Sequence, residues 1–337
     1  MGTVIPLKKE INNSYLDLKN LVGSKLDIVS QIIDLKLESK ISLIHKMTSH
    51  HLNSGGKRIR PLLTLASAKL CGYKDGSRDI NLAACIELIH SATLLHDDVI
   101  DNSDLRRGIK TANSIWGNQS SILVGDYLFS RCFEIMVEDG SEEILKLLSS
   151  TSSTIAQGEV LQLEHKGEID LLEETYFNII NMKTAALFSA ATRIGACVGN
   201  KSKKEKDALE SYGKNLGLAF QIADDALDYF SNKRIFGKAI GKDFYEGKTT
   251  LPLIIVFQRS NNEERNFLTE VFKKEKRNED DFSEILALIN KYKAIQVSLK
   301  RAEYFVNVSY DALSIFKDSK EKTILQNLTG FSLNRSF

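Results

Sequence analysis

The stretch that decides the fold is LLHDDVIDNSDLRRG, residues 94–108. Its acidic triplet, Asp-Asp-x-x-Asp, ends an apolar segment, and the same spacing returns in QIADDALDYF, residues 221–230. A buried carboxylate without a partner is costly, so a cation is expected to balance each triplet. The two triplets therefore predict two helices that present acidic groups to cations.

The spacing of each triplet puts two carboxylates on one face of a helix. Residues four apart are neighbours on a helix, so Asp97 and Asp101 project together while Asp98 lies about 100° around the axis. Asp224 and Asp228 repeat this geometry. Carboxylates this close repel one another, and Mg²⁺ with its oxygen ligands removes the repulsion. A single triplet is also typical of a solvated acidic face, but both triplets here interrupt apolar faces.

The rest of the chain predicts an all-α fold. Only three of its 337 residues are proline, and apolar residues recur at spacings of three and four, as in Leu82, Ile86 and Ile89. Breaks rich in Gly, Ser and Asn divide it into roughly ten or more helices, with no convincing alternating strand. No linker rich in Ser, Gly or Pro separates two halves, so we expect a single domain over residues 1–337.

Composition excludes several classes of function. Lys and Arg number 45 against 44 Asp and Glu, so no overall field attracts nucleic acid. The four cysteines lie far apart without C-x-x-C spacing, which favours reduced thiols over a zinc site or disulfides. The N-terminal residues carry no export or lipid-anchor pattern, and the longest apolar run, residues 251–257, is too short to cross a bilayer. We expect a cytoplasmic protein that contacts membranes only through an amphiphilic product.

Three basic stretches lie close to the acidic triplets in the sequence. They are GGKRIRP (55–61), DLRRG (104–108) and GKAIGKDFYEGKTTLP (237–252), and their cations are Lys57, Arg58, Arg60, Arg106, Arg107, Lys238, Lys242 and Lys248. Backbone N–H groups after glycines, and guanidinium forks, bind phosphate oxygens. One such loop alone is often solvated surface, but three of them beside two acidic motifs predict a polyanionic substrate. His90, two helical turns before Asp97, is expected to face the same site, whereas His96 is expected to have a packing role.

At this point the sequence resembles a known family. Five of its motifs occur in the order and approximate spacing of the trans-isoprenyl diphosphate synthases. They are GGKRIRP, LLHDDVIDNSDLRRG, MKTAALF, FQIADDALDY and GKAIGKDFYEGKTTLPL. They look most like the bacterial long-chain octaprenyl and decaprenyl diphosphate synthases, and the likeness runs from about residue 20 to the end. It implies the all-α isoprenoid synthase bundle, with two aspartate-rich helices facing one another across a central cavity, usually in a homodimer.

The resemblance also implies roles for individual residues, and none of the motifs departs from the pattern. About three Mg²⁺ ions are expected, held by Asp97, Asp101 and Asp224 with support from Asp98, Asp225 and Asp228. The pocket for isopentenyl diphosphate is expected to contain Lys57, Arg60, His90 and Arg107. The allylic diphosphate is expected to contact Arg106, Lys183, Thr184, Gln221, Lys238 and Lys248.

The implied reaction is head-to-tail prenyl transfer. The allylic C1–O bond ionises, the C3=C4 double bond of isopentenyl diphosphate attacks the cation, and loss of a C2 proton gives a trans product five carbons longer. The dipoles of Lys183 and Gln221 favour ionisation, and the released diphosphate is the expected proton acceptor. The expected catalytic residues are therefore Asp97, Asp98, Asp101, Arg106, Lys183, Gln221 and Asp224.

Product length depends on the space below the first triplet. Ala92 and Thr93 stand where an aromatic residue would wall the cavity, so the growing chain is expected to pass downward. Phe129 and Phe133 follow on the next helix, and Phe133 is predicted as the tunnel floor. We expect about eight to ten isoprene units, as in a quinone side chain.

Other readings remain open from the sequence. The alternatives are a synthase with a C15–C20 product, a non-catalytic subunit of a heteromeric synthase, a class I terpene cyclase and an acidic scaffold that binds Ca²⁺. The second Asp-Asp-x-x-Asp and GGKRIRP speak against a cyclase, intact motifs speak against an inactive subunit, and the basic loops speak against a Ca²⁺ scaffold.

Overall fold

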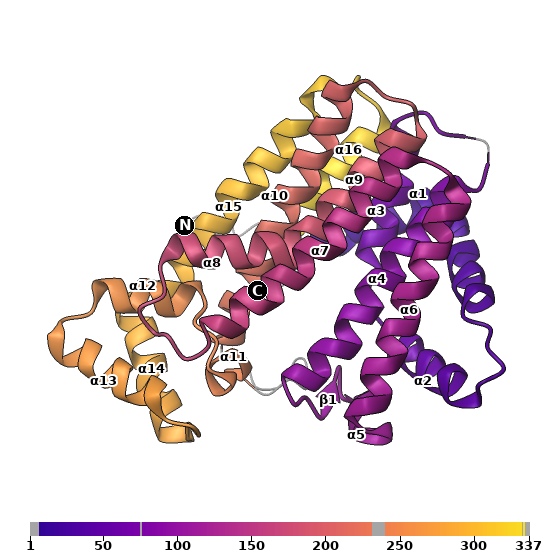
Figure 1. The fold of residues 1–337 in the computed structure, drawn as a ribbon. Helices are drawn as coiled ribbons and strands as arrows, with labels where there is room; N and C mark the ends of the chain where they lie inside the picture. The colour runs from indigo at the N-terminus through magenta and orange to yellow at the C-terminus, as the bar shows by residue number, and fades with distance from the viewer. Residues whose placement is uncertain (1–6, 75, 231–239, 332, 334–337) are drawn as a thin grey trace.

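The computed structural model describes residues 7–74, 76–230, 240–331 and 333 of the chain (Figure 1). Its N-terminal half contains helices α1 (Leu7–Lys36), α2 (Ser42–Asn53), α3 (Ile59–Leu70), α4 (Arg78–Ile100), α5 (Ala112–Trp116), α6 (Asn118–Asp139) and α7 (Glu142–Glu164). The hairpin β1 (Leu105–Arg106) and β2 (Ile109–Lys110) is the one sheet in the described residues. The prediction of an all-α fold is confirmed, and this hairpin is an addition to it.

The second half is also helical. It contains α8 (Glu173–Ile180), the π-helix η1 (Asn181–Ala185), α9 (Ala186–Val198), α10 (Lys203–Asp228), α11 (Lys242–Glu246), α12 (Leu251–Arg259), α13 (Asn262–Lys273), α14 (Glu279–Lys291), α15 (Ala294–Ala312), the 3₁₀ turn η2 (Leu313–Ile315) and α16 (Lys320–Thr329). Capping boxes begin α10, α13 and α14, because the side chains of Ser202, Asn261 and Asn278 each accept the amide three residues later.

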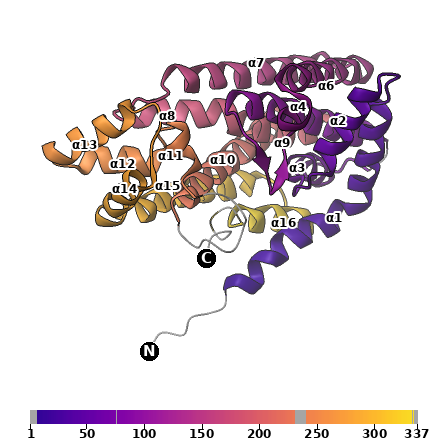
Figure 2. The same ribbon diagram turned by 90° about the horizontal axis from the view of Figure 1, so that it is seen from below.

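Two hydrophobic cores lie along the molecule. The first lies among α1, α3, α4, α6, α9 and α16, and the second among α8, α12, α13, α14 and α15. Helix α10 contributes Leu209 and Leu216 to the first core and Leu218 and Ile222 to the second. Figure 2 shows α1 to α6 at one end and α12 to α14 at the other, with α10 between them. Helix α10 therefore passes from the first core to the second, and its acidic end lies beside the second core.

Ion pairs fix the helix that carries the first acidic triplet. Asp79, in the first turn of α4, accepts a hydrogen bond from Lys25 of α1 at 2.6 Å. Arg78 donates from Nε and Nη2 to both oxygens of Asp139 at 2.8 and 2.9 Å, so the start of α4 meets the end of α6. The two helices therefore run antiparallel, and both acidic triplets occupy helix C-terminal ends. Carbonyl groups make such ends partly negative, which favours a bound cation beside them.

Candidate active site

The first acidic triplet lies at the C-terminal end of α4, and its aspartates have different surroundings. Asp98 is 2% exposed and accepts three hydrogen bonds from Arg106, from Nε at 3.0 and 3.1 Å and from Nη2 at 2.8 Å. Burial, together with the neighbouring carboxylate of Asp101, raises the pKa of Asp97, although Lys183 opposes the rise. Asp98 thus holds the hairpin that carries Arg106, while Asp97 keeps a carboxyl group that a cation would stabilise.

The second triplet ends α10 in a similar way. Asp225 is 4% exposed and accepts hydrogen bonds from the Tyr176 hydroxyl at 2.6 Å and from Gln221 Nε2 at 2.7 Å. Burial raises the pKa of Asp225 to about 7 despite these two donors. Asp228 accepts the backbone amide of Asp243 at 2.8 Å, so the loop after α10 is attached to the triplet. Asp224 is partly exposed beside them.

Lysines of the Gly-rich loop join the two triplets. Lys248 Nζ lies 2.9 Å from both oxygens of Asp101, and it also pairs with Glu246 at 2.8 Å. Lys242 donates to the hydroxyl of Ser103 at 2.9 Å. These contacts cross from the C-terminal end of α10 to that of α4, so the two acidic helix ends face one another. The ammonium on Asp101 shows that this position accepts a cation.

The residues expected to bind isopentenyl diphosphate gather at the start of α3 and beside α4. Arg60 Nη1 lies 3.1 Å from His90 Nε2, and burial followed by the charge of Arg60 lowers the pKa of His90 well below its usual value. The neutral imidazole accepts from the guanidinium. Gly56 adopts φ +151°, and a Cβ there would lie 2.7 Å from Arg107 Nη1. The Gly55-Gly56 loop therefore leaves room for Arg107, and Lys57 lies 4.5 Å above the ring of Phe331.

A cavity beside the second triplet is lined by Lys183, Thr184 and Gln221. Lys183 and Thr184 belong to η1, where a π-helical turn interrupts the helical segment formed by α8 and α9. Such turns often occur at functional sites. Thr184 donates to Gln221 Oε1 at 2.8 Å, and Gln221 donates in turn to Asp225. A cavity of about 90 Å³ lies against Lys183, Gln221, Asp225, Asp243 and Lys248.

The remaining predicted residues are Lys238 and the residues expected to set chain length. Lys238 lies outside the described residues. Ala92 is fully buried and Thr93 bonds to the carbonyl of His90 in its own helix. Phe129 packs against the first core with its ring 6.1 Å from that of His96, whereas Phe133 is 49% exposed. In this single chain, Phe133 therefore does not line an enclosed cavity.

Sequence reasoning missed four groups at the site. Glu159 and Gln162 of α7 bind Lys183 Nζ at 2.6 and 3.0 Å. Asp243 lies beside the second triplet, and burial followed by the charge of Asp228 raises its pKa. Burial, followed by the charges of two arginines, lowers the pKa of His51 to about 4. Glu159 had a signal, a carboxylate within the largely apolar stretch IAQGEVLQLE.

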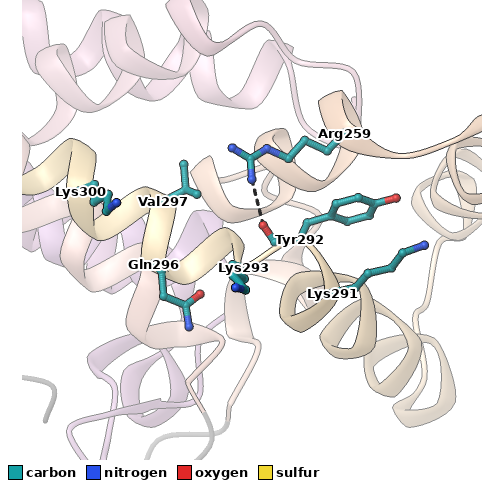
Figure 3. Close-up of a pocket in the computed structure, with 7 residues that line it drawn as sticks. All are labelled: Arg259, Lys291, Tyr292, Lys293, Gln296, Val297 and Lys300. Carbon is teal, nitrogen blue, oxygen red and sulfur yellow. Dashed lines mark hydrogen bonds between the residues drawn. The ribbon is translucent and has the colours of Figure 1, made fainter.

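A separate basic pocket lies between the ends of α12 and α14 and the start of α15 (Figure 3). It has a volume of about 340 Å³ and is lined by Arg259, Lys291, Tyr292, Lys293, Gln296, Val297 and Lys300. Arg259 donates to the carbonyl of Tyr292 at 3.0 Å, and Lys291 pairs with Glu264. None of the predicted site residues lines it, so it takes no part in the site described above.

The acidic residues fit Mg²⁺ bound together with a substrate. In the parts of the chain that the structure describes, no three His, Cys, Asp or Glu side chains form a ready-made metal cage. Mg²⁺ usually takes one or two carboxylates and completes its shell with water and substrate phosphates. The raised pKa of Asp97 and the ammonium held by Asp101 both indicate carboxyl groups that require a positive partner. The donor set is therefore suited to Mg²⁺ and a diphosphate.

Together, the helical bundle, the facing acidic helix ends and the surrounding cations define an all-α enzyme of the isoprenoid synthase fold. A family model described as Polyprenyl synthetase matches residues 41–289. The octaprenyl diphosphate synthase of Haemophilus influenzae is 35% identical over 331 residues, which cover 98% of this chain and 100% of that protein. The chain therefore belongs to the polyprenyl synthetase family and is a prenyltransferase, as the sequence predicted.

Solved structures agree with this assignment. A decaprenyl diphosphate synthase from Rhodobacter capsulatus matches with a TM-score of 0.91 at 38% identity, covering 96% of this chain and 99% of that one. A polyprenyl synthase from Caulobacter crescentus CB15, complexed with calcium and isoprenyl diphosphate, matches with a TM-score of 0.92 at 40% identity, covering 96% and 98%. The predicted isoprenoid synthase fold is confirmed.

Proposed function

We propose that this prenyltransferase adds isopentenyl diphosphate repeatedly to an allylic diphosphate and makes a long-chain trans-polyprenyl diphosphate. The observation that supports this reaction most directly is the pair of acidic helix ends joined by Lys248 and Asp101. Full-length likeness to octaprenyl and decaprenyl synthases favours a long-chain product over the C15–C20 alternative. We propose a product of about eight to ten isoprene units that supplies a quinone side chain.

The acidic residues would hold about three Mg²⁺ ions with the allylic diphosphate. Asp97, Asp101 and Asp224 are the proposed ligands, supported by Asp225 and Asp228. Bound Mg²⁺ supplies Lewis-acid stabilisation of the charge that develops on the leaving diphosphate. A polyprenyl synthase of the same fold was solved in complex with calcium and isoprenyl diphosphate, which supports a divalent cation as part of the substrate complex.

The protein's own cations complete the binding of the allylic diphosphate. Arg106 reaches the site on the β1–β2 hairpin and is held there by Asp98. The other proposed contacts to the allylic diphosphate are Lys183, Thr184, Gln221, Lys238 and Lys248. As the C1–O bond breaks, the Lys183 ammonium stabilises the departing oxygen, and the Gln221 amide presents a dipole to the allylic cation. The released diphosphate then takes the C2 proton.

Isopentenyl diphosphate is proposed to bind at the other wall. Arg60 and Arg107 offer guanidinium forks, Lys57 offers an ammonium and neutral His90 orients Arg60. Gly56 has no side chain to displace the guanidinium of Arg107, which lies against it. This arrangement separates the two diphosphates while their prenyl groups meet between α4 and α10.

The chain-length residues stay a proposal. Buried Ala92 and neighbouring Thr93 leave small side chains one turn before Asp97. Phe129 is proposed to line the path of the product and Phe133 to close it. Because Phe133 is 49% exposed in one protomer, its role as a floor requires that a second chain cover it.

We propose a homodimer for the same reason. Helices α6 and α7 contact one another, and both carry exposed apolar side chains, including Leu123, Val137, Val160 and Leu163 at 57–68% exposure. Burying them against a second copy gains about 25 cal/mol for each Å² of apolar surface. Val137→Asp is expected to shift the protein toward monomer in sedimentation. Leu172→Asp, at the N-cap position just before α8, is the matched exposed control.

Location and domain organisation are also proposals. None of the helices in the described part of the chain combines the length and apolar character needed to span a membrane. We propose a cytoplasmic enzyme with peripheral membrane contact during product release, without nucleic acid partners. A single domain over residues 1–337 is supported by the contribution of α10 to both cores.

One experiment tests the proposed function directly. The purified full-length chain is incubated with Mg²⁺, labelled isopentenyl diphosphate and either geranyl or farnesyl diphosphate, and the extracted prenols are sized. Extension to about eight to ten isoprene units supports the proposal. Products that stop at C15–C20 would support the shorter-chain alternative, and absence of extension with every starter would support a non-catalytic subunit.

A further inference from the structure

Lys183 is held by two side chains that none of the sequence motifs includes. Glu159 Oε2 lies 2.6 Å and Gln162 Oε1 lies 3.0 Å from Lys183 Nζ. Glu159 and Gln162 are three residues apart on α7, so they present neighbouring side chains on one face. A lysine ammonium has three N–H donors, and these two acceptors use two of them. One donor is left for a further ligand.

The backbone also fixes Lys183 relative to α7. A Cβ at Gly158 would lie 2.8 Å from Met182 Cβ and 2.9 Å from the amide nitrogen of Lys183. Any larger residue at Gly158 would push α7 away from η1. Helix α7 therefore contacts the π-helical turn at the residue that carries the ammonium, and the next residue along α7 is Glu159. Backbone contact and side-chain bonds act on the same lysine.

The surroundings of Glu159 are energetically unfavourable for a charged carboxylate. Its side chain is 18% exposed and that of Lys183 is 23% exposed. Burial, together with the negative field of Asp97, raises the pKa of Glu159 to about 7, although Lys183 opposes the rise. Apolar residues would be less costly at this position, since a buried carboxylate loses its hydration. Groups kept in such an environment are concentrated at functional sites.

We propose that Glu159 and Gln162 are positioning residues, which hold the Lys183 ammonium so that its third N–H points at the allylic diphosphate. This inference rests on the proposed function, in which Lys183 stabilises the departing oxygen. Glu159 supplies a carboxyl oxygen and Gln162 supplies an amide oxygen as acceptors, so the ammonium is fixed in direction as well as in place. Without them the flexible four-carbon stem of Lys183 leaves the ammonium free to pair with Asp97 instead.

The test is a double-mutant cycle in the full-length enzyme. Glu159→Leu is expected to lower kcat with an allylic starter by about 10-fold to 10²-fold, while KM for isopentenyl diphosphate changes less than about twofold. Glu159→Gln keeps an acceptor and is expected to recover most of this loss. In a Lys183→Met background, Glu159→Leu is expected to have almost no further effect, because the group that it positions is absent.

The controls separate positioning from folding and from the proposed function. Glu164→Gln removes an exposed carboxylate from the same helix and is expected to leave kcat and Tm unchanged. Equal losses from Glu159→Leu in the wild-type and Lys183→Met backgrounds would overturn the inference, as would a loss that Glu159→Gln does not recover. Failure of the wild type to extend any starter would instead refute the proposed function, which the same assay reports separately.

Discussion

The ion pair between Asp98 and Arg106 leads to the sharpest prediction. The motif alone does not separate Asp98 from Asp97 and Asp101, yet the structure gives Asp98 three hydrogen bonds from one guanidinium group. Asp98→Asn retains one acceptor oxygen and turns an amide toward the donors of Arg106. We therefore expect lower stability and a displaced Arg106, with little change in the affinity for Mg²⁺.

The size of the effect follows from the burial of the pair. Breaking a buried ion pair by removing one partner costs about 3–5 kcal/mol. Asp98 is 2% exposed but Arg106 is 26% exposed, so water solvates the freed guanidinium and the expected cost is reduced to about 2–3 kcal/mol. With about 2.1 cal/mol/K of unfolding entropy per residue, this lowers Tm by about 3–4 °C.

Two assays then distinguish the roles of the aspartates. Asp98→Asn is expected to lower kcat/KM for the allylic diphosphate by about 10-fold to 10²-fold, because Arg106 is no longer fixed. The Mg²⁺ concentration for half-maximal rate is expected to stay within about twofold of the wild type. Asp27→Asn, an exposed change on α1, is the control. A strong rise in the Mg²⁺ requirement without a fall in Tm would refute this reasoning and make Asp98 a metal ligand.

Three further perturbations follow from the geometry. Asp97→Asn is expected to lower kcat by about 10²–10³ and to raise Tm of the metal-free protein, because burial already disfavours that carboxylate. Gly56→Ala places a Cβ 2.7 Å from Arg107 Nη1 and is expected to raise KM for isopentenyl diphosphate in steady-state assays, with KM for the allylic substrate unchanged. His51 has a folded-state pKa of about 4 against about 6.5 unfolded, so only the unfolded chain binds its proton between these values. Stability therefore falls with decreasing pH, by about 1–2 kcal/mol from pH 6.5 to 5. In denaturant titrations, His51→Gln is expected to flatten this dependence, whereas the change of the exposed residue His45→Gln is not.

Local patterns predicted the long helices well because each carries its own signals. Apolar spacing identifies α4 and α10, and a capping box marks the start of α10. The sequence did not predict the β1–β2 hairpin, because its two-residue strands are fixed by the contact of Arg106 with Asp98. It also did not predict the π-helical turn η1, where the close approach of Gly158 from α7 is a tertiary contact. Short elements that depend on contacts with residues outside themselves leave little trace in a single sequence.

The site shows the same division between local and distant causes. The acidic triplets and basic loops were visible because each occupies a short stretch of sequence. Lys248 is 147 residues from Asp101, and its contact with both carboxylate oxygens is known only from the fold. Glu159 and Gln162 lie outside every recognised motif, and only their distances to Lys183 give them a role.

The second aspartate of each triplet has a different function from its neighbours. Asp98 and Asp225 are 2% and 4% exposed, and each has both carboxylate oxygens bonded to protein donors. A helix turns about 100° per residue, so the residue after the first aspartate projects to one side of the face shared by the carboxylates that are four apart. Those donors come from Arg106 for one triplet and from Tyr176 and Gln221 for the other. We therefore propose two roles within each triplet: the first and last aspartates serve the proposed metal and substrate, and the middle one attaches the surrounding structure to the same helix end. Asp228 also contributes to this attachment, because it accepts the amide of Asp243.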